Sequence, residues 1–74
     1  MHIDSLIGMA NQIGNFFEAM PDRAEALEGV AKHLKGFWDP RMRRELLAHV
    51  DSHDGAGLNA VVAEAIRRHR ALLV

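Results

Sequence analysis

The five histidines are the side chains of this 74-residue sequence that could support metal or acid–base chemistry. His49 and His53 are four residues apart, a spacing that places both imidazoles on one face of a helix and allows them to share an ion. A structural zinc site usually takes four ligands; Asp51 and Asp54 are near in sequence, but Asp51 points to another face of the helix. We therefore favour a structural role, in which both histidines line the edge of an apolar helix stripe, and predict no metal site.

No other group of residues resembles a catalytic site. Ser5 and Ser52 have no histidine at a suitable spacing, and the glycine-containing stretch GNFFEAM lacks the lysine and the strand of a phosphate-binding loop. The absence of cysteine excludes disulfides, thiolate metal sites and iron–sulfur ligation, and is compatible with a reducing cytoplasm. We predict no catalytic, cofactor-binding or metal-binding residue and no cofactor in this chain.

A cluster of arginines behind an aromatic pair is the second feature with functional potential. Arg41, Arg43 and Arg44 stand at the start of an expected helix, where the partial positive charge of the N-terminus disfavours cations. Arginine, tryptophan and methionine are enriched in protein interfaces, and Trp38 and Met42 belong to the same short stretch. The pattern predicts a protein-binding surface made of these five residues.

Two other interpretations of the arginines stay open. One is a solvated charge run beside core aromatics, although Arg43 falls inside an apolar arc and so needs a path to solvent or an acidic partner. The other is a nucleic-acid surface, which the charge distribution does not favour. Residues 1–31 contain five acids and one base, a charge of −4, and residues 32–74 contain eight bases and five acids, a charge of +3. The total is −1, and a segment of +3 is weak evidence for nucleic acid.

Helical periodicity dominates the elements that must position these residues. We expect four helices, at about residues 3–20, 22–35, 40–52 and 59–72. There is no alternating β-branched run that would indicate a strand. The sequence therefore predicts an all-α fold, a small four-helix bundle with short loops, in a single domain over residues 1–74.

Local signals place the ends of these helices. Asp39 is expected to cap the third helix with Pro40 at its first position, Asn59 is expected to open the fourth, and Gly36 is expected to end the second. Gly14 lies at the margin of a wide apolar arc on the first helix, which favours close approach of another backbone.

The same wide arc has a second margin, formed by Met9 and Phe16. These residues could belong to the core, or four short helices could leave them uncovered, and an uncovered apolar patch marks an interaction surface. A chain of this size draws only roughly 3–5 kcal/mol from its core, so a partner chain or a homodimer of the isolated chain is compatible with the pattern.

No apolar run approaches the ~20 residues that span a bilayer, and the start MHIDSL lacks the features of a signal peptide. We expect a soluble chain without a membrane role.

Three blocks of the sequence resemble a known family. They are MANQIGNFFEAMPDR at 9–23, FWDPRMRRELLAHVD at 37–51 and GLNAVVAEAIRR at 57–68. Together they are similar to the delta subunit of bacterial NAD-dependent, molybdenum-containing formate dehydrogenase, over about residues 6 to 70. The first two blocks are specific. The chain departs from the family at Asn59-Ala60, where a Ser-Pro pair is expected, but both pairs suit a helix start.

The resemblance implies a non-catalytic accessory chain of a cytoplasmic enzyme. In that family the alpha subunit carries bis-molybdopterin guanine dinucleotide and iron–sulfur clusters, and other subunits carry FMN and bind NAD. The expected partner is the alpha subunit, with the arginine stretch as the docking surface and Asn11 and Gln12 of the first block as further contacts. The expected role is assembly or stability of the active enzyme. The alternatives are a transient maturation chaperone for cofactor insertion and a helical nucleic-acid-binding module.

Overall fold

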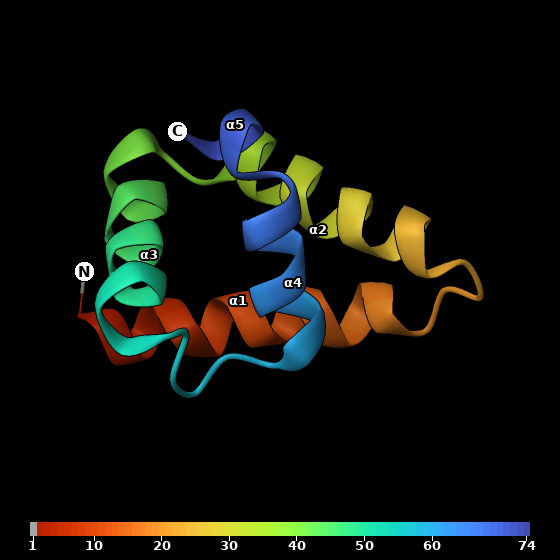
Figure 1. Ribbon diagram of the computed structural model, residues 1–74, viewed down its shortest axis with the longest axis horizontal. Coiled ribbons are helices and arrows are strands. Elements are labelled where there is room, and N and C mark those ends of the chain that lie inside the picture. Colours follow the sequence, from red (N-terminus) through yellow and green to blue (C-terminus); the bar gives the residue numbers. More distant parts are fainter. Residues whose placement is uncertain (1) are drawn as a thin grey trace.

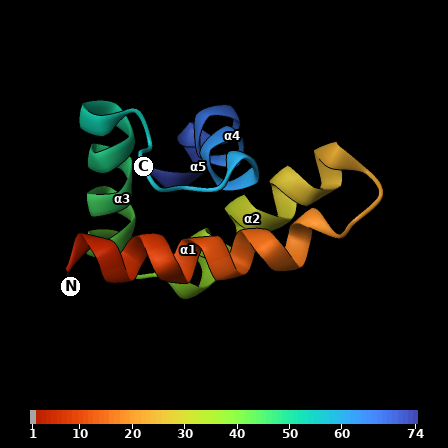
Figure 2. The same cartoon turned by 90° about the horizontal axis from the view of Figure 1, so that it is seen from below.

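The computed structural model describes residues 2–74 and contains only helices and the connections between them (Figure 1). The helices are α1 (Ile3–Glu18), α2 (Arg23–Phe37), α3 (Pro40–His53), α4 (Ala60–Arg68) and α5 (Arg70–Leu73). The predicted all-α class is confirmed. Helix α3 runs across α1 in both views rather than alongside it, so the arrangement is less regular than four aligned helices (Figures 1 and 2). Within residues 2–74, no helix has both the length and the apolarity needed to cross a membrane.

Two aspartates begin the middle helices, as the sequence predicts for Asp39. The Asp22 carboxylate accepts hydrogen bonds from the backbone N–H groups of Ala24 at 2.9 Å and Glu25 at 3.3 Å. The Asp39 carboxylate accepts one from the Met42 N–H at 3.0 Å, with Pro40 following at the first helical position. Each carboxylate satisfies N–H groups that have no partner inside the helix, which fixes where α2 and α3 start.

The predicted end of α2 at Gly36 is wrong. The helix continues through Gly36 to Phe37, and the Trp38 N–H still donates to the Leu34 carbonyl at 3.1 Å. Gly36 is exposed, with no atom within 4 Å of the position that a Cβ would take, so it does not disturb the helix. The chain leaves the helical conformation at Trp38. Pro40 follows two residues later and disfavours the helical conformation at Asp39, the residue before it.

The last predicted helix is divided into two. Its backbone breaks at His69, where φ is −112° and ψ is 28°, and the short helix α5 follows. Helix α5 packs beside the C-terminal half of α2 (Figure 1), and Leu73 is only 2% exposed there. A continuous helix would have carried Leu73 in another direction, so burial of this leucine accounts for the break.

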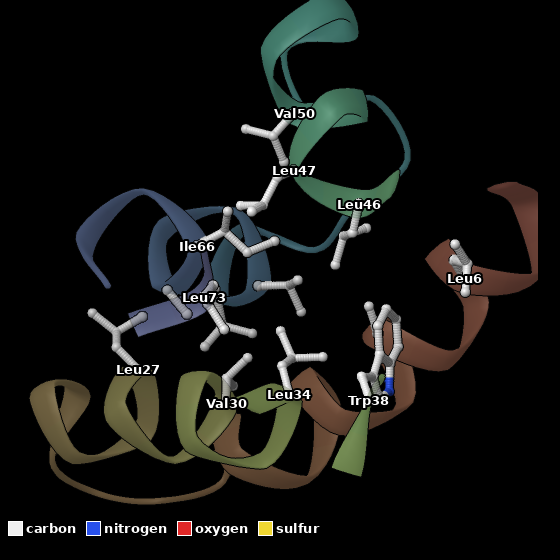
Figure 3. Packing of buried hydrophobic residues seen from close by; sticks show 14 residues of the cluster. Leu6, Leu27, Val30, Leu34, Trp38, Leu46, Leu47, Val50, Ile66 and Leu73 are labelled. Atoms are coloured by element: carbon white, nitrogen blue, oxygen red, sulfur yellow. The ribbon is translucent and has the colours of Figure 1, made fainter. Parts of the chain in front are cut away.

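All five helices contribute to one apolar core (Figure 3). Its largest fully buried side chains are Leu6, Leu27, Leu34, Leu46, Ile66, Val30, Val61 and Val62. Helices α1 and α4 are in close contact at Gly14, where a Cβ atom would lie 2.5 Å from Val62 Cγ2 and 3.0 Å from Val61 Cγ1. The predicted packing role of Gly14 is confirmed, but the atoms that approach it belong to valine side chains rather than to another backbone.

Candidate partner-binding surfaces

Arg43 is an internal connector between three helices. Its Nη1 donates to the carbonyl oxygens of Trp38 at 2.6 Å and Lys35 at 3.2 Å, and its Nε donates to that of Leu73 at 3.4 Å. The first two oxygens belong to the C-terminal end of α2, where the helix dipole attracts a cation. Arg43 therefore holds α3 against α2 and α5. The sequence predicts that Arg43 needs an acidic partner or a path to solvent. In the structure, backbone carbonyl oxygens accept its hydrogen bonds instead.

Trp38 lies in the core and does not form part of the surface. Its side chain is 6% exposed, and it stands between the end of α2 and α1 near Leu34 and Leu6 (Figure 3). The predicted direct contact between Trp38 and a partner does not fit this position, because a buried indole cannot reach another chain. Its role is to anchor the corner that joins α2 to α3.

Arg41 and Arg44 are different from the other arginines of the chain. Both are exposed, and within residues 2–74 neither lies within 4 Å of a carboxylate. Most other arginines form ion pairs, in which Arg23 lies 2.7 Å from Glu64, Arg67 3.0 Å from Asp54 and Arg70 2.6 Å from Asp51. We call Arg41 and Arg44 the arginine pair.

The surroundings of the arginine pair are partly apolar. Met42 is half-buried and packs against the core, so little of its side chain is available to a partner. A hollow of about 380 Å³ adjoins Arg44 between α3 and the end of the chain. It is lined by Pro40, Arg43, Arg44, Leu47, Leu73 and Val74. The site therefore combines two exposed charges with an adjacent apolar depression.

Asn11 and Gln12 are adjacent in sequence but have separate roles in the structure. The Asn11 amide donates to the Gly57 carbonyl at 2.9 Å and accepts from the Asn59 N–H at 2.9 Å. Asn59 in turn donates through its side chain to Asn15 at 2.8 Å. Asn11 thus fastens the α3–α4 loop to α1 and has its polar atoms occupied, whereas Gln12 is exposed. Of the two, Gln12 is the residue available to a partner.

A row of four aromatic rings crosses from α1 to α2, and the sequence did not predict it as a unit. The ring centroids of Phe16 and Phe17 are 5.1 Å apart, those of Phe17 and His33 6.2 Å, and those of His33 and Phe37 4.6 Å. We call Phe16, Phe17, His33 and Phe37 the aromatic row. Its two ends are exposed, Phe16 at 74% and Phe37 at 78%. Of the two residues that could be either core or uncovered, Met9 packs against the core and Phe16 is exposed. The connection of Phe16 to Phe37 depends on the packing of α1 against α2.

The histidines on α3 form a local arrangement of their own. The rings of His49 and His53 stack with centroids 5.2 Å apart, and His49 Nε2 lies 2.7 Å from the Ala56 carbonyl oxygen. Within residues 2–74, no three or more His, Cys, Asp or Glu side chains come together as a metal-binding group would. The His49 contact joins α3 to the loop that follows it.

Comparison with known families identifies the chain. Residues 5–66 match the family described as the NADH-dependent formate dehydrogenase delta subunit FdsD. The chain belongs to this delta-subunit family. The match includes the arginine pair and the whole aromatic row, and ends before α5. No curated protein and no solved structure matches the chain.

Proposed function

We propose that this delta-subunit chain is a non-catalytic accessory subunit that binds the alpha subunit of NAD-dependent formate dehydrogenase and supports the assembly or stability of the active enzyme. The observation that carries the proposal is the family membership over residues 5–66. The alpha subunit is the proposed carrier of bis-molybdopterin guanine dinucleotide and iron–sulfur clusters, with FMN on another subunit. This chain has no cysteine with which to ligate such clusters.

The arginine pair supports docking on a partner. Arg41 lies in the first turn of α3, where a cation is disfavoured by about 0.3–1 kcal/mol, and within residues 2–74 neither Arg41 nor Arg44 lies within 4 Å of a carboxylate. Carboxylates on the partner would compensate both charges and would also steer association. In this proposal Arg41, Arg44 and Gln12 make the contacts, while Asn11, Trp38 and Arg43 hold the surface in shape.

The test is a pull-down of the tagged chain co-expressed with the alpha subunit, with the molybdenum and pterin content of the recovered subunit measured. The variant R41A/R44A should retain roughly tenfold less alpha subunit than the wild type, as expected for the loss of two interfacial charge contacts. The matched control is R67A/R68A, which removes the same charge from α4. Equal recovery with R41A/R44A and the wild type would refute the arginine docking assignment.

The cofactor content separates accessory subunit from chaperone. Recovery of cofactor-loaded alpha subunit supports a stably bound accessory subunit. Recovery of cofactor-free alpha subunit alone would instead establish a maturation chaperone that leaves after insertion. If the wild-type chain recovers no alpha subunit, the proposed partner is wrong.

A further inference from the structure

The exposed ends of the aromatic row are the largest apolar features of the surface. Phe16 and Phe37 are 74% and 78% exposed, whereas the other exposed large hydrophobic residues of the described chain are the smaller Leu72 and Val74. A fully buried aromatic side chain removes about 150–250 Å² from water, so these two rings leave roughly 300 Å² uncovered. The largest apolar patch of a typical monomer measures about 300–600 Å² and is often functional, so the exposed rings are a candidate interaction site of ordinary size.

The row is a rigid platform rather than two loose side chains. Phe17 is half-buried, packs against the core and lies directly on Gly29 of α2, where an added Cβ would collide with its ring. The T-shaped contact between Phe16 and Phe17, with ring planes at 89°, and the contact of His33 with Phe37 hold the outer rings against this centre. Since both outer rings project from helices, a partner that covers them would order little additional structure.

The shape of the row argues against a second copy as its occupant. In a two-fold contact the same patch meets itself, so projecting rings would meet projecting rings instead of a groove.

One end of the row is close in the chain to the arginine pair. Phe37 and Arg41 are four residues apart, so their Cα atoms lie within about 14 Å of each other. Gln12 stands one helical turn before Phe16 and is exposed beside the other end of the row. The row thus has apolar rings at its centre and polar or charged groups at both ends. A protein interface has the same arrangement, with an apolar core and a polar rim.

We infer that the aromatic row is the apolar centre of the docking surface, and that it inserts into an apolar groove of the partner subunit whose rim carries carboxylates next to Arg41 and Arg44. This inference rests on the proposed function, because the partner is the same subunit. It adds the location of the anchor residues, Phe16 and Phe37, and the chemistry of the surface that receives them.

The test compares the affinity of full-length variants for the purified alpha subunit in a binding titration. F16Q/F37Q should raise Kd by at least about thirtyfold, because central aromatic residues dominate interface energies. The matched control L72Q replaces another exposed apolar side chain, which lies outside the row and does not line the hollow beside Arg44, and it should bind like the wild type. Thermal unfolding of each variant verifies folding, and little change is expected because the replaced side chains are exposed.

Each outcome of the titration decides a different point. A large loss for F16Q/F37Q with L72Q unchanged supports the inference. Binding of F16Q/F37Q within threefold of the wild type would overturn it and leave the proposed function intact. Failure of the wild-type chain to bind would overturn both. A wild-type homodimer in sedimentation that F16Q/F37Q dissociates, with binding to the alpha subunit unchanged, would assign the row to a second copy and also overturn the inference.

Discussion

Replacing Gly14 by alanine is expected to destabilise the fold through a single added methyl group. The new Cβ would lie 2.5 Å from Val62 Cγ2 and 3.0 Å from Val61 Cγ1. Both valines are 0% exposed, and their branched side chains have little rotamer freedom with which to move away. Overpacking of this kind costs about 1–3 kcal/mol, while the higher helix propensity of alanine returns roughly 0.5–1 kcal/mol. The difference between these two ranges is about 0–2.5 kcal/mol, and the contact at 2.5 Å places the expected net loss in its upper part, at roughly 1–2 kcal/mol.

Gly8 of the same helix provides the matched control. It is exposed, and no atom lies within 4 Å of the position that its Cβ would take. Gly8→Ala therefore keeps only the propensity gain and should stabilise the chain by about 0.5–1 kcal/mol. The same chemical change on one helix thus has opposite signs at two positions.

Thermal unfolding followed by circular dichroism measures both effects. A change of 1 kcal/mol shifts Tm by about 4–8 °C in a domain of this size, so Gly14→Ala should lower Tm by roughly 5–15 °C and Gly8→Ala should raise it by a few degrees. If Gly14→Ala left Tm unchanged or raised it, the close approach of α1 and α4 would be refuted. An equal rise for both variants would mean that helix propensity alone decides.

The remaining predictions concern polar contacts, and urea unfolding measures all three. Arg43→Ala should lower the free energy of unfolding by about 2 kcal/mol, because it removes charge-assisted hydrogen bonds to three backbone carbonyls. A loss below about 0.5 kcal/mol would show that Arg43 does not connect the helices. Asp39→Ala should cost about 1 kcal/mol through loss of the cap on the Met42 N–H, and an unchanged stability would contradict that cap. Arg23→Ala should cost less than about 1 kcal/mol despite its 2.7 Å contact with Glu64, since both side chains are nearly half exposed and solvent screens the pair; a larger loss would contradict this.

Features encoded by neighbouring residues could be predicted from the sequence. The start of α3 follows from Asp39 and Pro40, which act within a single helical turn. Gly14 could be assigned to a helix contact from its position at the margin of the apolar arc. The predicted stop at Gly36 failed because an exposed glycine near a helix end is compatible with continuation as well as with a stop. The break at His69 depends on the burial of Leu73 against α2, which no local pattern records.

The candidate surface shows the same division between local and long-range information. The unusual position of Arg43 in an apolar arc could be recognised, but its partners come from the end of α2 and from α5. The arginine pair could be located from the clustering of arginines at the start of an expected helix. Only the structure shows that Arg41 and Arg44 have no carboxylate within 4 Å among residues 2–74, whereas Arg43 connects helices. The aromatic row joins Phe16 to Phe37 across two helices, so helical periodicity within either segment could not reveal it.

The central claim is that this chain is a stably bound accessory subunit of the enzyme. The most direct measurement is the molar ratio of this chain to the alpha subunit in purified, active, cofactor-loaded formate dehydrogenase, determined by quantitative mass spectrometry. A stably bound accessory subunit should be present in equimolar amounts. Active, cofactor-loaded enzyme that contains none of this chain would contradict it.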